Sequence, residues 1–403
     1  MDLNGARLRL LFLVPFTPRL DGRHGGARVT AQLIANLADR HAVALVHLAR
    51  RGEAPVDAEL ARACERVERV EQTRRVGRVG PKIALLRGVP TWASEVTDAG
   101  LVARVRELAR RWEPDVVQLE FPVAGRYLRA LRDCPAPRVM ADHEASVRDL
   151  RAWGGPLAPI TRMLDDRAWR RFERRVIEQV QAVVVFTARD RRALEPIAAG
   201  TPIVELPFGV AVPAQPAGAA GTPPPSILFV GNFMHPANTD AALWLGRSLL
   251  PIVRSERPDA RLTIVGPGPP PEVRALAGDG IDVTGEVADV TPYLRQAAVV
   301  AAPIRVGGGM RVKVLEALAA GKAVVATPLA VEGLDVTAGR QLAVAEREAD
   351  FARAVSRLLA DEEERVALGG RARDWACEHL GWGASIDRYE QLYRALVAGG
   401  RPS

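Results

Sequence analysis

The residues best suited to chemistry in this chain lie in one glycine-rich segment that follows an apolar stretch at 298–302. The segment begins with three glycines and a methionine: Gly307, Gly308, Gly309 and Met310. Arg311, Lys313 and Glu316 come next, in an alanine- and leucine-rich stretch typical of a helix. Glycines let a ligand approach the backbone, and a helix N-terminus attracts anions. Two cations in the first turn, where the dipole alone disfavours them, therefore predict a phosphate or diphosphate ligand.

Glu316 adds a second capability to the same predicted helix. From the inner face of the helix, its carboxylate can accept hydrogen bonds from the hydroxyl groups of a ligand. The alternative for the whole segment is an ordinary turn between a strand and a helix, with no ligand.

The first half of the chain alternates short apolar runs with helical patterns. The predicted strands are 8–14, 42–48, 115–119, 138–141 and 182–186, and the predicted helices are 25–37, 102–112 and 160–179. Near-continuous apolar strands that alternate with helices are typical of a parallel sheet covered on both faces. The run at 8–16 imitates a signal sequence, but it is short and lacks a small-residue cleavage site, so we interpret it as a buried strand.

A proline-rich break at 211–225 separates a second series of the same kind. Its predicted strands are 227–230, 262–265, 299–302 and 323–326. We therefore expect an α/β protein with two doubly wound, Rossmann-like domains, 1–210 and 226–380, joined by a linker at 211–225. Two such domains would face each other across a cleft at the carboxyl ends of their strands. A last amphipathic helix within 381–403 is a candidate to cross back to the first domain.

Two loops in the first domain are further candidates. Gly25 and Gly26 precede a helix and can face a phosphate, with a simple turn as the alternative. His143 follows the strand at 138–141, where a histidine can donate to a phosphate or hydroxyl or move a proton. Asp142 and Glu144 are its candidate partners, or caps of the following helix.

The second domain offers two comparable loops. Gly231 and Asn232 follow its first strand, and Asn238 is expected to cap the next helix. A second loop holds Gly285, Glu286 and Val287, which precede a short helix and can contact a base through their backbone. A plain strand-to-helix loop is the equal alternative there.

Composition narrows the class of function. The net charge is +7, but arginine dominates and no nucleic-acid-binding signature is visible, so we expect no nucleic-acid partner. Three distant cysteines indicate reduced thiols in the cytoplasm, and no apolar run is long enough to span a bilayer. The arginine-rich stretch at 160–179 favours a solvated face with local ion pairs, because acidic residues dilute its charge. Peripheral contact with anionic lipid at the inner membrane face is the alternative.

With these residues in place, the chain resembles the retaining glycosyltransferases of family 4, which have the GT-B fold. The resemblance is strongest over 226–335 and rests on four stretches: 229–232, 283–287, 307–321 and 331–334. Within this group the chain is similar to the exopolysaccharide-type sugar transferases that carry a Gly-Gly-x-x-Arg-x-Lys loop.

The resemblance implies a metal-independent, retaining transfer, without a cofactor, from a nucleotide-diphosphate sugar to a glycan, lipid-linked or small-molecule acceptor. It implies that Glu316 bonds the donor ribose and that Arg311 and Lys313 neutralise the diphosphate. It also implies that Gly25 and Gly26 close over the phosphates and that His143 approaches the donor sugar. The loop at 285–287 would contact the base.

Two departures from the family pattern affect these roles. Gly308 stands where the family has its first glutamate, so the identity of the sugar does not carry over. Asn232 and His235 lie in the loop where many relatives have an arginine and a lysine. A nucleotide-sugar epimerase of the same architecture, or a non-catalytic protein that binds sugar nucleotides or glycans, is the alternative function.

Overall fold

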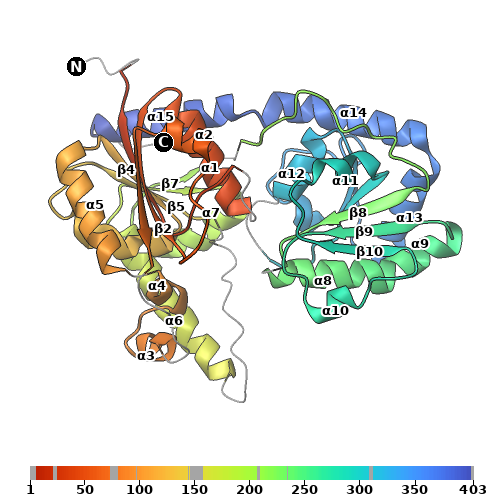
Figure 1. The fold of residues 1–403 in the computed structure, drawn as a ribbon, viewed down its shortest axis with the longest axis horizontal. Coiled ribbons are helices and arrows are strands. Elements are labelled where there is room, and N and C mark those ends of the chain that lie inside the picture. The colour runs from red at the N-terminus through yellow and green to blue at the C-terminus, as the bar shows by residue number, and fades with distance from the viewer. Residues whose placement is uncertain are drawn as a thin grey trace. The chain divides into compact units, whose positions relative to one another are not determined.

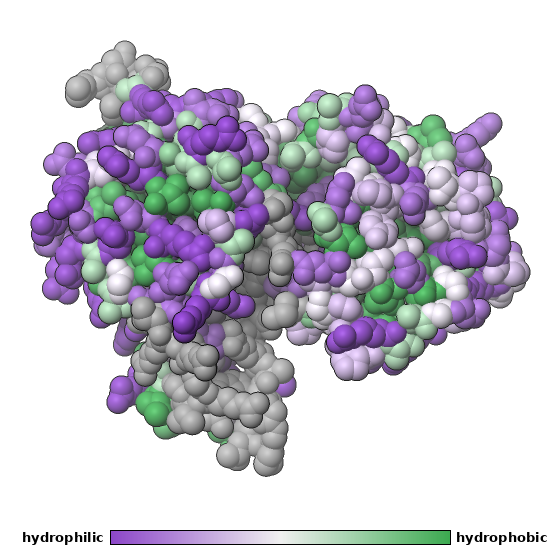
Figure 2. All heavy atoms as spheres, in the orientation of Figure 1, coloured by the Kyte–Doolittle hydropathy of each residue, from purple (hydrophilic) through white to green (hydrophobic). Residues whose placement is uncertain are grey.

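The computed structural model describes residues 6–20, 25–72, 80–96, 98–143, 145, 158–206, 209–233, 235–307 and 312–400. The chain forms two compact units: residues 1–207 with 385–403, and residues 208–384. Each is described separately (Figure 1). Hydrophilic side chains cover much of the face of each unit in view (Figure 2). No helix in the described ranges is long and apolar enough to cross a membrane.

The first unit is built on a parallel sheet with the order β3-β2-β1-β4-β5-β6-β7 in the described residues. Its strands are β1 (Arg9–Val14), β2 (Ala42–Ala49), β3 (Arg66–Glu71), β4 (Val116–Glu120), β5 (Arg138–Ala141), β6 (Ala182–Val185) and β7 (Ile203–Glu205). Its helices are α1 (Gly25–Ala38), α2 (Ala58–Ala63), α3 (Gly80–Leu86), α4 (Thr91–Glu95), α5 (Ala99–Trp112), α6 (Ala158–Ile177) and α7 (Ala188–Leu194), with 3-10 turns at Pro122–Leu131 and Glu195–Ile197. The apolar residues of β1, β4 and β6 are buried, as parallel strands covered on both faces require.

The second unit repeats this plan with the order β10-β9-β8-β11-β12-β13 over its described residues. The strands are β8 (Ser226–Val230), β9 (Arg261–Val265), β10 (Ile281–Gly285), β11 (Val299–Ala302), β12 (Ala323–Ala326) and β13 (Ala343–Val344). The helices are α8 (Pro236–Trp244), α9 (Leu250–Glu256), α10 (Pro271–Arg274), α11 (Thr291–Gln296), α12 (Val312–Ala319), α13 (Glu348–Ala360) and α14 (Glu362–His379), with a π-helical turn at Leu245–Leu249 and a 3-10 turn at Pro328–Val331. The expectation of two doubly wound, Rossmann-like domains is confirmed for both units.

The proline-rich stretch expected as a linker packs against the second unit. Backbone carbonyl oxygens of this stretch accept hydrogen bonds from the side chains of Lys322, Arg365 and Arg373. Lys322 is fully buried, and burial lowers the pKa of its ammonium from 10.5 to about 8. Basic side chains on the body of the unit therefore hold 213–221 in place through its backbone.

The last helix, α15 (Trp382–Val397), joins both units in sequence. Trp382 lies in the second unit against Gly209, whereas the residues from Ser385 onward belong to the first unit. There the Tyr389 and Tyr393 rings are buried, and Glu390 pairs with His41 at 2.9 Å. The chain thus returns to the domain in which it began.

His47 in β2 makes the stability of the first unit depend on pH. The ring is fully buried, and neither ring nitrogen has a hydrogen-bond partner in the described part of the chain. Burial, helped by the charge of Arg69, lowers the pKa of His47 from 6.5 to about 4. The folded unit therefore keeps this histidine neutral where the unfolded chain would protonate it.

Because the unfolded chain binds this proton below pH 6.5 and the folded chain only near pH 4, the free energy of unfolding falls as the pH drops through that window. Each unit of difference between the two pKa values corresponds to about 1.4 kcal/mol, so the decrease in the free energy of unfolding approaches about 3 kcal/mol near pH 4. In urea titrations, the free energy of unfolding should fall between pH 7 and pH 4 in both proteins. We expect this fall to be about 3 kcal/mol smaller in His47→Leu than in the wild type. Equal losses in the two proteins would contradict this assignment.

Candidate active site

The helix α12 presents the candidate groups of the second unit at the carboxyl end of a buried strand. β11 ends at Ala302, and the backbone then turns through Gly307, whose φ of 104° favours glycine. One face of α12 packs into the core with Val314, Leu315 and Leu318, which leaves Lys313 and Glu316 half-buried on the other side. Gly308, Gly309, Met310 and Arg311 lie outside the described residues, so their roles stay predictions.

The ammonium of Lys313 is oriented by two uncharged groups. It donates a hydrogen bond to Oδ1 of Asn238 and lies 5.0 Å from the centroid of the Phe229 ring. Asn238 in turn donates from Nδ2 to the backbone oxygen of Asn232 at 2.6 Å. The amide oxygen and the aromatic face thus help to fix the position of this ammonium at the edge of the sheet.

The expectation that Asn238 caps a helix is wrong. α8 begins at Pro236 with His235 at its N-cap, so Asn238 lies inside the first turn. Its side chain bonds the backbone oxygen of Asn232 and the ammonium of Lys313 instead of a backbone N–H at the start of the helix. The sequence could not show this because Lys313 and Asn238 are 75 positions apart.

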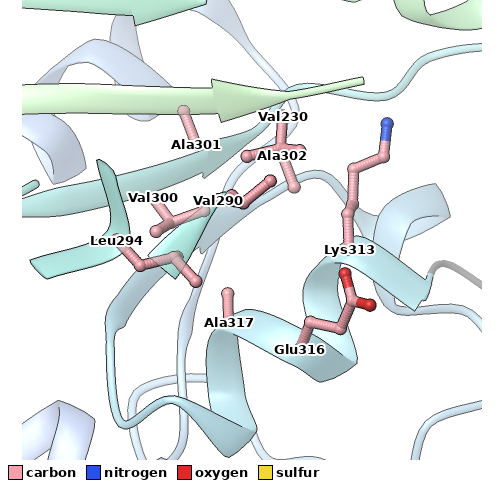
Figure 3. Close-up of a pocket in the computed structure, with 9 residues that line it drawn as sticks. All are labelled: Val230, Val290, Leu294, Val300, Ala301, Ala302, Lys313, Glu316 and Ala317. Atoms are coloured by element: carbon pink, nitrogen blue, oxygen red, sulfur yellow. The ribbon is translucent and has the colours of Figure 1, made fainter. Parts of the chain in front are cut away.

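A small pocket lies beside these two groups (Figure 3). Apolar side chains line most of it: Val230, Val290, Leu294, Val300, Ala301, Ala302 and Ala317. Lys313 and Glu316 supply its charged edge, and the ammonium of Lys313 extends beyond the end of β8 while the Glu316 carboxylate stays near α12 (Figure 3). This lining, which is apolar with few polar groups, has the composition usual in small-molecule sites.

Three loops meet at the same edge of the sheet. The backbone N–H of Gly231 donates to Val265 at 2.9 Å, and that of Gly266 donates to Gly285 at 2.8 Å. A Cβ at Gly266 would lie 1.8 Å from the backbone oxygen of Gly231, so this approach requires glycine. The structure thus brings Gly231 and Gly285 to one edge, where Glu286 is exposed and Val287 is half-buried.

Arg305, in the loop before α12, serves a different purpose. Its guanidinium forms a fork with the carboxylate of Asp240, at 2.7 and 3.1 Å, and lies 4.5 Å from the centroid of the Trp244 ring. Such a bidentate pair neutralises the cation locally. Arg305 therefore anchors the loop to α8.

In the first unit, His143 is held by a carboxylate that sequence reasoning missed. Nε2 of His143 lies 2.7 Å from Oε2 of Glu120, and both side chains are buried. The imidazole stacks on Phe121, with ring centroids 4.0 Å apart and planes inclined by 7°. It also contacts Phe186 at 4.8 Å. The ring thus has a fixed position at the carboxyl end of β5.

Glu120 connects His143 to α1 directly and to α15 through Gln118. Thr30 of α1 donates to Oε2 of Glu120 at 3.3 Å, and Gln118 donates to Oε1 at 3.0 Å. The hydroxyl of Tyr393, on α15, then donates to Gln118 at 3.2 Å. Burial raises the pKa of Tyr393 well above 10, with smaller contributions from Tyr389 and Glu120, so this hydroxyl stays a neutral donor. The helix that begins with Gly25 and Gly26 is therefore linked to His143 through Thr30.

The partners expected for His143 were its sequence neighbours. Asp142 is buried beside it, and Glu144 lies outside the described residues. A signal for the observed partner is present in the sequence, because Gln118 and Glu120 are polar residues at the carboxyl end of an apolar strand. A fully buried carboxylate there needs a partner on a neighbouring strand.

Comparisons with known proteins find similarity to sugar transferases. Residues 224–361 match the family described as glycosyl transferases group 1. Over a stretch of 216 residues, the chain is 31% identical to a phosphatidyl-myo-inositol mannosyltransferase of Mycolicibacterium smegmatis. This stretch covers 50% of this chain and 54% of that protein. A second stretch of 137 residues is 29% identical to a protein of the cps region of Klebsiella pneumoniae, over 32% of this chain and 35% of that one. The chain thus spans about half the length, or less, of these curated relatives.

Solved structures show the same fold over nearly the whole chain. Sucrose-phosphate synthase from Thermosynechococcus elongatus aligns with a TM-score of 0.72 at 18% identity, over 98% of this chain and 100% of that one. Anabaena HepE, in complex with UDP and glucose, aligns with a TM-score of 0.66 at 14% identity, over 96% and 100% of the two chains. At these identities the likeness shows the fold, which is that of the GT-B glycosyltransferases.

Removing the Glu120 carboxylate should destabilise the first unit. Glu120→Ala leaves the donors of His143, Thr30 and Gln118 facing a cavity, so we expect the free energy of unfolding to fall by about 3 kcal/mol. Glu120→Gln keeps the shape and one acceptor oxygen, and should cost about half as much. Urea titrations would measure both losses.

The matched control is Glu59→Gln, because Glu59 is exposed on α2. Its effect should stay within about 0.5 kcal/mol. If Glu120→Ala were as mild as this control, the carboxylate would not hold the network together.

Proposed function

We propose that this chain is a glycosyltransferase that moves a sugar from a nucleotide-diphosphate sugar to an acceptor hydroxyl. One observation carries the proposal: Lys313 and Glu316 stand one turn apart on α12 at the edge of an apolar pocket. They lie within the stretch that matches group 1 glycosyl transferases. A cation for a diphosphate, a carboxylate for ribose hydroxyls and an apolar surface for a base are what such a donor needs. The structures of HepE with UDP and with UDP-glucose support this donor class.

The proposed roles follow the charges that develop during transfer. When the bond between the sugar and the phosphate breaks, negative charge grows on the leaving diphosphate. Lys313, with Arg311 and the N–H groups at the start of α12, would stabilise that charge. Glu316 would hold the ribose, which fixes the donor before its bond breaks. Backbone groups at Gly231, Asn232 and 285–287 complete the proposed donor site.

The first unit is proposed to hold the acceptor and to orient the donor sugar. His143 would contact the sugar, and Glu120 would act as a positioning residue because it fixes the imidazole at 2.7 Å. Gly25 and Gly26 would approach the phosphates. The proposed acceptor is a glycan, a lipid-linked compound or a small molecule, and the name of the phosphatidyl-myo-inositol mannosyltransferase relative supports the lipid-linked class. The proposed location is the cytoplasm, at the inner face of the membrane.

We also propose that the transfer retains the anomeric configuration and needs no metal ion, as in the retaining enzymes of family 4. The bond from the anomeric carbon to the diphosphate oxygen breaks, and the acceptor oxygen bonds to the same face of that carbon. The acceptor proton passes to the departing diphosphate. Gly308 replaces a glutamate of the family pattern, so contacts to the sugar would differ from those of the family.

Lys313→Ala and Glu316→Ala should each lower kcat/KM by at least about a hundredfold, because each removes a charged contact to the donor. Both side chains are half-buried outside the core, so the unfolding transition should change little. The measurement is release of nucleoside diphosphate with the acceptor present. Arg353→Ala and Glu363→Ala, exposed on α13 and α14, are the controls and should retain full activity. Full activity in Lys313→Ala and Glu316→Ala would refute the donor site.

Reaction stereochemistry and metal dependence test the finer proposal. NMR of the product should show the anomeric configuration of the donor, and an excess of EDTA should leave the rate unchanged. Inversion, or loss of activity that Mg²⁺ or Mn²⁺ restores, would contradict it. Incubation with donor alone separates the rival functions: an epimerase would convert the donor without an acceptor, and a binding protein would bind it without turnover.

A further inference from the structure

The helices α3 and α6 form an apolar and basic projection on the first unit. Figure 1 shows α3 and the N-terminal half of α6 extending beyond the sheet, next to α4. The described residues include eight large hydrophobic side chains that are exposed, and five of them lie on these two helices. They are Ile83, Leu86, Ile160, Met163 and Leu164. Leu86 is 84% exposed, and so dense a group of exposed apolar side chains is typical of a binding surface.

Six exposed arginines accompany the apolar group on α6. They are Arg162, Arg167, Arg170, Arg171, Arg174 and Arg175. Within the described ranges, only Arg170 and Arg174 of these six form an ion pair, with Asp166 and Glu178 respectively. Hydrophobic and hydrophilic atoms are both visible on the projection in Figure 2.

Two of the three acidic residues that dilute the charge of α6 in the sequence, Asp165 and Glu173, are turned inward. The third, Asp166, pairs with Arg170. Asp165 accepts hydrogen bonds from the backbone N–H and the hydroxyl of Thr91, at 3.0 and 2.9 Å. Glu173 is also buried, with 1% of its surface exposed. The charge balance of the sequence therefore understates the positive charge on the outer side of this helix.

We propose that this projection docks on an anionic lipid bilayer. Ile160 and Leu164 are four residues apart, which is about 6 Å along the helix axis. That length matches the depth of about 5–10 Å to which apolar side chains enter the boundary between headgroups and acyl chains. Arg167 and Arg171 come one and two turns later, at the level where guanidinium groups would meet lipid phosphates.

Two other occupants fit the observations less well. A second copy of the chain would bring two sets of arginines together, and like charges oppose such an interface. A single-stranded nucleic acid would need exposed aromatic rings for its bases. The aromatic rings of α6 are engaged inside the unit, where Trp169 stacks on Trp92 with centroids 5.8 Å apart.

Vesicle flotation of the full chain tests the proposal. The protein should bind vesicles of equal parts phosphatidylcholine and phosphatidylglycerol, bind pure phosphatidylcholine at least tenfold more weakly, and release in high salt. Arg167→Gln combined with Arg171→Gln should weaken binding about 25-fold, at roughly fivefold per arginine. The matched control, Arg106→Gln with Arg110→Gln, removes two exposed arginines from α5 and should change binding less than twofold.

The apolar contribution needs its own pair of variants. Leu86→Ser with Met163→Ser should weaken binding at least tenfold, whereas Ile252→Ser with Val366→Ser, exposed in the second unit, should not. An environment-sensitive dye on Met163→Cys, in a Cys377→Ser background, should shift to the blue on anionic vesicles. The same dye on Val366→Cys should not shift. Circular dichroism checks that each variant is folded.

Three results would overturn the proposal. The first is no binding of the wild type to anionic vesicles. The second is equal loss of binding in the variants and their matched controls. The third is a wild-type dimer that Leu86→Ser with Met163→Ser dissociates, without vesicle binding, which would make the projection an interface between copies. Because flotation needs neither donor nor turnover, each result leaves the proposed transfer standing.

Discussion

A positive charge at the positive end of a helix is unfavourable unless neighbouring groups or a bound anion stabilise it. Lys313 occupies that position at the start of α12, where its ammonium contacts Oδ1 of Asn238 and the Phe229 ring. Arg305, in the loop before this helix, forms an ion pair with Asp240. The second unit therefore places the Lys313 cation beside an apolar pocket, and the proposed capture of an anionic donor depends on this feature.

The first unit depends on the opposite arrangement, a buried carboxylate that its surroundings satisfy. Glu120 accepts hydrogen bonds from α1 and β4 and pairs with His143 after β5. Tyr393 extends the network to α15, so the returning end of the chain helps to fix the imidazole. The position of the imidazole in this unit thus depends on a helix that lies more than two hundred residues away in sequence. Removing any single member of such a buried hydrogen-bond network lowers the free energy of unfolding, because it leaves the other members without partners.

The sequence predicted the inner strands of both sheets and missed the edges. The missed strands β3, β7, β10 and β13 are the outermost strands of the two sheets. Inner strands are apolar runs covered on both faces, whereas β3 reads Arg-Val-Glu-Arg-Val-Glu and β13 has two residues. The same limit applies to the candidate site. Local motifs identified Lys313, Glu316 and His143, but their partners Asn238 and Glu120 come from distant segments, and only the folded chain brings them together.

Binding of a nucleoside diphosphate by α12 and its pocket underlies the proposed function, and a thermal-shift titration measures it. One of the common nucleoside diphosphates should raise the melting temperature, by an amount that grows with its concentration. Lys313→Met should abolish this shift while its own unfolding transition stays close to that of the wild type. If no nucleoside diphosphate shifts the wild type, or if Lys313→Met responds as the wild type does, this helix does not form the donor site.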